Sequence, residues 1–125
     1  MNNSKKKNIL ISAGGTAGHV LPAIEVAKEF YSRGYLVSFF TDSRMYNNIK
    51  SKPNFINGEI KLFSIKGRGI DRTNIFKNII TLILMTIGIL QSFSRLIFIR
   101  PVIAIGFGGY ITVPVLFACY IFRVK

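Results

Sequence analysis

Short apolar runs alternate with longer segments of helical periodicity along the chain. Runs of aliphatic, β-branched and aromatic residues predict buried strands at residues 8–13, 35–41, 59–65 and 102–106. Between and after them, apolar positions predict helices at residues 20–32, 75–99 and 113–122, and a short helix within the polar stretch 42–52, with a loop at 53–58. Strands that alternate with helices predict an α/β fold with a Rossmann-like, open parallel sheet.

Proline and glycine residues predict where some helices begin and end. Pro22 suits the first turn of the helix at residues 20–32, where a missing N–H group costs nothing, and Gly34 suits its C-terminal cap. Pro101 predicts that the long apolar helix ends at Arg100, because the residue before a proline avoids the α conformation.

A glycine-rich loop, Ala13–His19 (AGGTAGH), follows the first predicted strand and opens the first predicted helix. Glycines let the backbone approach a ligand there, and the helix N-terminus favours a diphosphate or another anion. A dinucleotide-binding loop with Asp42 as the ribose-binding acid, and a purely structural turn, are the alternatives. His19 is placed to exchange a proton with a bound ligand or, alternatively, to cap the helix.

The balance of charged residues favours an anionic partner. The formal net charge is +12, although a composition rich in Lys, Asn and Ile also fits a drift of base composition. No aromatic-basic RNA signature accompanies the charge, so we expect no nucleic-acid partner. Cys119 is the single cysteine and the five acids are scattered, so we expect no disulfide, metal site or cofactor. The basic segment Met1–Lys7 precedes an apolar run too short for an export signal.

The segment Asn78–Ser94 carries no charge and is apolar on all sides. A transmembrane span is one interpretation, although polar residues dilute the segment, and a helix buried on the sheet is another. The third is a membrane-facing helix flanked by Lys77 and Arg95, which would meet anionic lipid. In that case the apolar residues that enter the interface are Ile79, Ile83, Ile87 and Leu90.

Two glycine loops in order carry a resemblance to a known family. Gly14–Ala23 (GGTAGHVLPA) resembles the GGTGGHxxPA signature of MurG-type N-acetylglucosaminyltransferases, and Gly106–Pro114 (GFGGYITVP) resembles their GxGGYxxxP loop. Between these two motifs, Lys66–Ile70 (KGRGI) resembles the basic loop that follows the third strand in this family. Either glycine loop alone is a weak signal, but the pair at this separation is specific.

The resemblance implies the N-terminal half of a GT-B glycosyltransferase of family 28. Such enzymes transfer N-acetylglucosamine from UDP-N-acetylglucosamine to undecaprenyl-diphosphoryl-muramoyl pentapeptide (lipid I), which forms lipid II in peptidoglycan synthesis. By the match, His19 is the candidate catalytic residue, while Thr16, Ala17 and Gly18 approach the donor. The residues matched to acceptor-diphosphate binding are Gly15, Arg68, Gly108, Gly109 and Tyr110.

Two features qualify the resemblance. Ala17 replaces a family glycine, which would cost roughly 1 kcal/mol if the position required a positive φ. The sequence stops where another strand is expected, so we expect residues 1–125 to be an incomplete acceptor domain that associates with the membrane and lacks a C-terminal nucleotide-sugar domain. That domain would be supplied either on the same polypeptide, in cis, or by a separate polypeptide, in trans. A non-catalytic, membrane-recruiting subunit is the alternative function, and the cytoplasmic face of the plasma membrane is the expected location.

Overall fold

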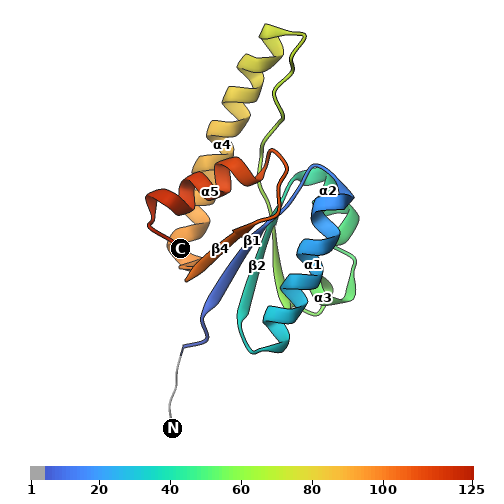
Figure 1. Ribbon diagram of the computed structural model, residues 1–125, viewed down its shortest axis with the longest axis vertical. Helices are drawn as coiled ribbons and strands as arrows, with labels where there is room; N and C mark the ends of the chain where they lie inside the picture. Colours follow the sequence, from blue (N-terminus) through green and yellow to red (C-terminus); the bar gives the residue numbers. More distant parts are fainter. Residues whose placement is uncertain (1–4) are drawn as a thin grey trace.

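The computed structural model describes residues 5–125 of the chain, and the start of the basic segment Met1–Lys7, on which the expectation about export partly rests, lies outside this range. Figure 1 shows the arrangement of the elements within it. In chain order they are β1 (Asn8–Ser12), α1 (Ala17–Ser32), β2 (Leu36–Thr41), α2 (Ser43–Ile49), α3 (Pro53–Ile56), β3 (Ile60–Ser64), α4 (Ile75–Ile99), β4 (Ile103–Gly106) and α5 (Thr112–Ile121).

The four strands form one parallel sheet in the order β3-β2-β1-β4. Leu10 of β1 lies opposite Ser38 of β2 on one side and Ala104 of β4 on the other, while Phe39 of β2 lies opposite Leu62 of β3. The predicted α/β fold with an open parallel sheet is therefore confirmed. Because all strands run the same way, the loops after β1, β2, β3 and β4 emerge at one edge of the sheet.

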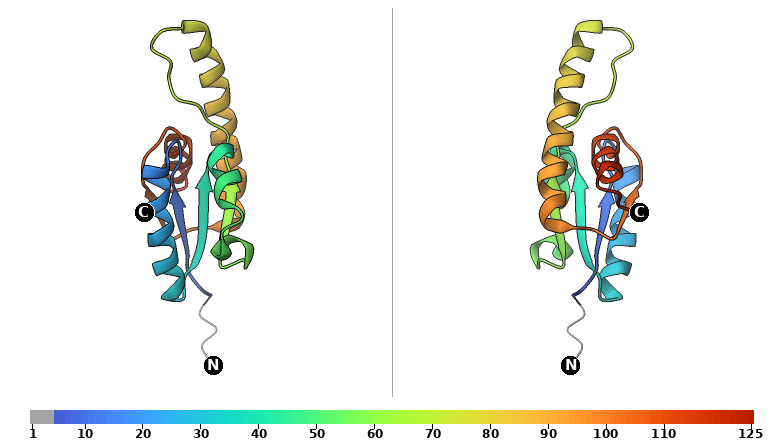
Figure 2. Two further views of the ribbon diagram at one scale, coloured as in Figure 1. Left: turned by 90° about the vertical axis from the view of Figure 1, so that its right-hand side faces the viewer. Right: turned by 90° about the vertical axis from the view of Figure 1, so that its left-hand side faces the viewer.

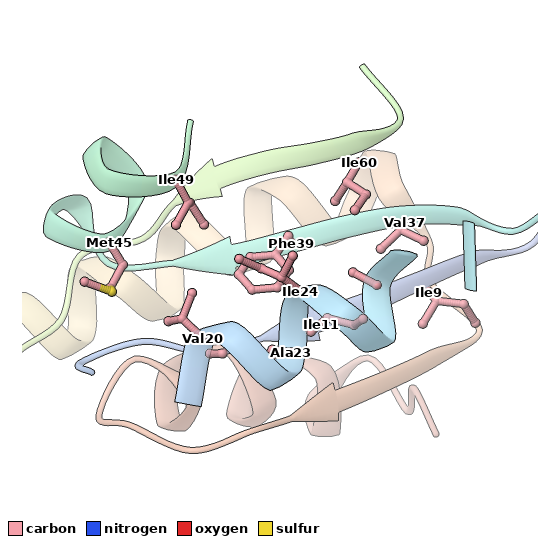
Figure 3. Packing of buried hydrophobic residues seen from close by; sticks show 12 residues of the cluster. Ile9, Ile11, Val20, Ala23, Ile24, Val37, Phe39, Met45, Ile49 and Ile60 are labelled. Atoms are coloured by element: carbon pink, nitrogen blue, oxygen red, sulfur yellow. The ribbon is translucent and has the colours of Figure 1, made fainter. Parts of the chain in front are cut away.

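The helices cover both faces of the sheet (Figure 2). Successive residues of a strand point to opposite faces, so Ile9 and Ile11 join a core beneath α1 and α2, whereas Leu10 joins a second core beneath α4 and α5. Figure 3 shows the first core, to which Phe39 of β2 and Ile24 of α1 both belong. Strands buried on both faces explain the continuous apolar runs in the sequence.

Helix α1 begins earlier than its apolar periodicity predicts. It starts at Ala17, after Thr16 in extended conformation, and not at Val20. Pro22 therefore lies in the second turn, and the prediction that it occupies the first turn is wrong. Since proline has no N–H group, the carbonyl of Gly18 loses its helical partner at that point, yet the helix continues to Ser32.

Glycine ends α1 as predicted. Gly34 has a φ of +88°, and its N–H group donates to the Tyr31 carbonyl while that of Tyr35 donates to Phe30. These two hydrogen bonds together form a Schellman motif. The rings of Phe30 and Tyr35 meet edge-on, with centroids 5.7 Å apart, and supply the apolar contact that accompanies the motif.

The region between β2 and β3 is more regular than its sequence predicts. The polar stretch after β2 forms α2, as expected, but Pro53–Ile56 forms the one-turn helix α3 where a loop is predicted. Pro53 occupies the first turn of α3, where its fixed φ favours the helical conformation. Phe55 then packs edge-on against Phe39 of the first core, with centroids 5.8 Å apart.

Helix α4 has the bounds predicted for it but places its apolar residues unusually. Asn74 caps its start, and Arg100 ends it in the left-handed conformation. Its N-terminal half, with the loop before it, projects beyond the edge of the sheet (Figures 1 and 2). The residues of α4 that are buried are mostly small or polar, namely Thr81, Gly88, Ser92 and Leu96.

Candidate functional site

The two glycine loops lie side by side, because β1 and β4 are neighbours in the sheet. The N–H group of Gly14 donates to the carbonyl of Gly108 at 3.4 Å. The imidazole of His19 packs against the backbone of Gly108, where an added Cβ would lie 3.1 Å from the ring carbon Cδ2. The sequence motifs around residues 14–23 and 106–114 therefore form one site.

Gly109 allows the closest approach between the loops. Its φ is +85°, a conformation that favours glycine, and an added Cβ would collide with the carbonyl group of Gly14. Gly108 also has a positive φ, of +105°. The second loop is held in place by Thr112, whose hydroxyl donates to the Gly108 carbonyl at 2.8 Å.

Asp42 is a positioning residue for the first loop that the sequence interpretation missed. Its carboxylate is 4% exposed and accepts from the N–H of Gly15 at 2.7 Å. The other carboxylate oxygen caps α2 by accepting from the N–H groups of Arg44 and Met45. With this burial and these bonds, Asp42 is not free to bind a ribose, which removes the main support for a dinucleotide-binding loop. An acid directly after a strand and before a helix is a recognisable N-cap signal.

Gly15 contributes space and not a hydrogen-bond donor. Its N–H group is committed to Asp42, and its carbonyl accepts from the guanidinium of Arg44. Its φ is +81°, and an added Cβ would lie 3.5 Å from the Tyr110 ring. Tyr110 of the second loop therefore lies over the first loop at Gly15.

Tyr110 also connects the glycine loops to the basic loop after β3. An added Cβ on Gly67 or Gly69 would lie within 4 Å of the Tyr110 ring. Burial, with the negative charge of Asp42, raises the pKa of Tyr110, against a smaller opposing effect of Arg44. The phenol thus remains a hydrogen-bond donor at neutral pH.

A hollow of about 520 Å³ opens beside Tyr110 at the carboxyl edge of the sheet. Arg44 and Lys66 line it together with Tyr110 and the buried Asp42, so two cations and one carboxylate border the space next to the loops. Arg68 is half-buried in the same basic loop, but it is not among the lining residues. The structure thus brings Gly15, His19, Gly108, Gly109 and Tyr110 together and places Arg68 nearby.

Both glycine loops present N–H groups without a protein acceptor. Within residues 5–125 no acceptor is recorded for the N–H groups of Ala17 and Gly18 at the start of α1, or for those of Gly108, Gly109 and Tyr110. A helix N-terminus beside a turn of positive-φ glycines offers these donors to an anion. A diphosphate, with its many acceptor oxygens, matches this arrangement.

The start of α1 resolves the question raised by Ala17. Its φ is not positive, because among the described non-glycine residues only Arg100 and Arg123 have positive φ. The methyl group is therefore accommodated without strain. The residues predicted to meet the donor, Thr16, Ala17 and Gly18, are all exposed, and the Thr16 hydroxyl lies 3.1 Å from Nδ1 of His19. This contact leaves Nε2 of the ring for a ligand. Among residues 5–125, no cluster of metal-ligating side chains is found.

Replacing Asp42 with asparagine tests the positioning of Gly15. The amide would turn a donor toward the Gly15 N–H or lose the cap of α2, so we expect a loss of about 1–3 kcal/mol in the free energy of unfolding. Chemical denaturation measures this value. Glu25→Gln, which removes the same charge from an exposed position of α1, is the control and should change stability by less than about 0.5 kcal/mol. Equal stability of the two variants would contradict the role of Asp42.

The outward face of α4 is a second candidate site. Ile79, Ile83 and Leu90 are 54%, 55% and 63% exposed, whereas Ile87, predicted to face a membrane with them, is half-buried at the edge of this face. The helix is long and apolar enough to cross a membrane by length and composition. Its C-terminal half, however, packs on the sheet: Gly88 lies against the Lys66 carbonyl, and Leu96 is fully buried. A helix fixed to the sheet in this way favours interfacial contact over a span.

Comparisons with known proteins agree with the geometry. The sequence model of the "Glycosyltransferase family 28 N-terminal domain" matches residues 9–125. The UDP-N-acetylglucosamine--N-acetylmuramyl-(pentapeptide) pyrophosphoryl-undecaprenol N-acetylglucosamine transferase of Pseudomonas putida (strain W619) is 37% identical over 109 residues, which are 86% of this chain and 29% of that enzyme. The enzyme of the same name from Rickettsia rickettsii (strain Sheila Smith) is 35% identical over 118 residues, 94% of this chain and 29% of its own length.

Solved structures share the fold. The crystal structure of Acinetobacter baumannii MurG superposes with a TM-score of 0.73 at 23% identity, over 95% of this chain and 34% of that one. The calicheamicin glycosyltransferase CalG4 superposes with a TM-score of 0.64 at 11% identity, over 95% of this chain and 31% of that one. The chain thus spans about a third or less of each of these proteins.

Proposed function

The chain belongs to glycosyltransferase family 28, and from this premise we propose that it is the acceptor-binding half of a GT-B enzyme of peptidoglycan synthesis. The enzyme transfers N-acetylglucosamine from UDP-N-acetylglucosamine to undecaprenyl-diphosphoryl-muramoyl pentapeptide, as the names of its relatives state for them. The nucleotide-sugar half is supplied in cis or in trans, because this chain corresponds to 29% of those relatives.

The main support for the proposal is that the ring of His19 lies on the backbone of Gly108. Both glycine loops therefore border one common site. The acceptor diphosphate is held by the free N–H groups of Gly108, Gly109 and Tyr110, with Arg68 from the neighbouring loop adding charge. Gly15 supports this loop by giving Tyr110 room to pack.

The donor binds at the start of α1. Thr16, Ala17 and Gly18 are exposed there, and the N–H groups of Ala17 and Gly18 point to the diphosphate of the sugar nucleotide as their acceptor. His19 lies between the two sets of donors. Its Nδ1 contacts Thr16, so Nε2 is the atom that accepts the proton of the attacking acceptor hydroxyl or orients that hydroxyl.

The exposed face of α4 holds the enzyme on the cytoplasmic face of the plasma membrane. Ile79, Ile83 and Leu90 enter the interface, with Ile87 at its edge, while the surrounding cations meet anionic lipid. This placement matches the acceptor, since a polyprenyl chain keeps the diphosphate at the membrane surface.

Substitution of His19 tests the catalytic part. With the chain joined after Lys125 to the remainder of the Pseudomonas putida enzyme, we expect His19→Ala to lower kcat for lipid II formation by about 10²–10⁴-fold. Farnesyl diphosphate should bind the variant within about threefold of the parent, since its donors are backbone amides of the other loop. Thr16→Val is the companion variant, and it should lower kcat less because it removes only the partner of Nδ1. Full activity of His19→Ala would exclude a chemical role for this residue.

A further inference from the structure

We propose that the hollow beside Tyr110 binds the peptide part of the acceptor, and that Arg44 and Lys66 pair there with a peptide carboxylate. This step rests on the proposed function and deepens it, since it gives a place to the part of the acceptor that the glycine loops do not hold. The hollow lies between the start of α2, the loop after β3, α4 and the second glycine loop. Its volume of about 520 Å³ falls within the roughly 300–1,000 Å³ that is typical of sites for organic ligands.

The hollow has an uncompensated positive charge. Arg44 and Lys66 line it from two separate segments, and the ion pairs described within residues 5–125 include neither of them. Asp42 also borders the hollow, but it is 4% exposed, and its two carboxylate oxygens accept from three backbone N–H groups. Two cations and one carboxylate leave a net charge of +1, which a single carboxylate of a ligand neutralises.

Both cations are attached to the walls of the hollow by polar contacts. The guanidinium of Arg44 donates from Nη2 to the carbonyl of Gly15, and its remaining N–H groups have no acceptor described within residues 5–125. The main-chain N–H of Lys66 donates to the side-chain carbonyl of Gln91 at 2.8 Å, which ties the loop after β3 to α4. The ammonium group of Lys66 is left for a ligand, and the planar guanidinium of Arg44 suits a carboxylate.

The lining of the hollow matches a peptide better than a phosphate group. Leu84 and the ring of Tyr110 supply apolar surface, and the hydroxyl groups of Ser43 and Tyr110 supply hydrogen-bond donors. A peptide with its carboxylate uses the apolar surface, the hydroxyl groups and the cations together, whereas a phosphate group would leave the apolar surface in water. The diphosphate also has donors of its own, because the N–H groups assigned to it begin at Gly108, which does not line the hollow.

The position of the hollow agrees with the parts of the acceptor. The names of the relatives give it four parts, namely undecaprenol, a diphosphate, a muramyl group and a pentapeptide. The proposed function places the first three at the membrane, at the second glycine loop and beside His19. Gly108 and Tyr110 are two residues apart and hence at most about 7 Å, while an extended pentapeptide spans about 17 Å. A peptide attached to a sugar beside Gly108 therefore reaches past Tyr110 into the hollow.

Calorimetric titration of the full chain with two synthetic ligands tests the proposal. The pentapeptide ligand is farnesyl-diphosphoryl-N-acetylmuramoyl pentapeptide. The short ligand is the corresponding N-acetylmuramoyl methylamide, which ends where the peptide begins and has no carboxylate. We expect the pentapeptide ligand to bind at least about tenfold more tightly, because a hydrogen-bonded charge pair contributes about this much.

Variants of the basic loop separate the peptide from the diphosphate. Lys66→Gln should weaken the pentapeptide ligand about tenfold and leave the short ligand within about twofold. Arg68→Gln, in the same loop, should weaken both ligands alike, because Arg68 is assigned to the diphosphate. Lys50→Gln removes a cation at the far end of α2 and should change neither affinity more than about twofold. The side chain of Lys66 is exposed, so its replacement should leave the melting temperature unchanged.

A change in the ligand tests the same pair from the other side. Amidation of the peptide carboxylates should lower the affinity of the parent chain about tenfold, and Lys66→Gln should then cause no further loss. Arg44→Gln should act in the same direction as Lys66→Gln, although it also removes a bond to the first glycine loop. An additional loss for Lys66→Gln with the amidated ligand would contradict pairing with a carboxylate.

The outcomes distinguish the peptide site from the proposed function. Equal affinities of the parent chain for the pentapeptide and short ligands would overturn the peptide site and leave the diphosphate proposal intact. Equal losses for both ligands in Lys66→Gln would assign the hollow to a phosphate group and also overturn the peptide site. Failure of the chain to bind either ligand or farnesyl diphosphate would reject the proposed function, and the peptide site with it.

Discussion

Replacing Gly109 with alanine should abolish diphosphate binding and destabilise the domain. The added methyl group would collide with the Gly14 carbonyl, so the two glycine loops would have to separate. The positive φ adds about 1 kcal/mol of strain and the collision about 1–3 kcal/mol, which together lower the melting temperature by about 10 °C. Calorimetric titration with farnesyl diphosphate, a soluble polyprenyl diphosphate, should show at least about a hundredfold loss of affinity.

Gly58→Ala is the matched control for this variant. Gly58 also has a positive φ, of +72°, but an added Cβ would have no neighbour within 4 Å. It should therefore carry only the backbone strain of about 1 kcal/mol and bind farnesyl diphosphate as the parent does. If Gly109→Ala bound the ligand as tightly as Gly58→Ala, the close contact of the two loops would not matter for binding.

Serine substitutions on the outward face of α4 should remove membrane binding without unfolding the domain. Ile79, Ile83 and Leu90 are all more than half exposed, so Ile79→Ser/Ile83→Ser/Leu90→Ser should change the free energy of unfolding by less than about 1 kcal/mol. Transfer of three such side chains to a lipid interface contributes about 1 kcal/mol each, so sedimentation with vesicles should show roughly a hundredfold weaker partition.

Two further variants serve as controls for this result. Leu21→Ser/Tyr31→Ser/Ile56→Ser removes three exposed apolar side chains from α1 and α3, and it should leave partition unchanged. Leu96→Ala removes a buried side chain of α4 and should cost about 2–5 kcal/mol of stability. Equal partition of the two serine triples would show that general surface hydrophobicity, and not α4, binds the membrane.

Local patterns predicted the parts of the fold that depend on local physics. The strands were predictable because both faces of the sheet are covered, which requires continuous apolar runs. Gly34 was predictable because a left-handed cap selects glycine. The start of α1 was not, since its first turn, Ala17–His19, carries no apolar periodicity and Pro22 suggested a later beginning.

The site was predicted through its glycines but not through its supports. The bond between Gly15 and Asp42 joins residues 27 positions apart, and no local pattern reports such a contact. The position of Arg44 depends on the same residue, because the other carboxylate oxygen of Asp42 caps the start of α2. Parallel strands place both loops at the same edge of the sheet. The loops are adjacent only because β1 and β4 are also neighbours in the sheet.

The orientation of α4 illustrates a limit of periodicity. The segment is apolar on all sides, so its sequence does not distinguish an inner from an outer face. Its inner face is marked instead by small residues: Gly88 lets the helix approach the loop after β3, and Ser92 is fully buried. Ile87 lies at the edge of the outward face for this reason, although it was grouped with Ile79 and Ile83.

The central claim is that the second glycine loop, packed against the first, binds the lipid-linked diphosphate, and amide NMR of the full chain during a titration with farnesyl diphosphate tests it most directly. The predicted result is saturable shifts of the Gly108, Gly109 and Tyr110 amides with a single dissociation constant, absent when Gly109 is replaced by alanine. Shifts confined to residues outside the second loop, or no saturable shift within it, would contradict the claim.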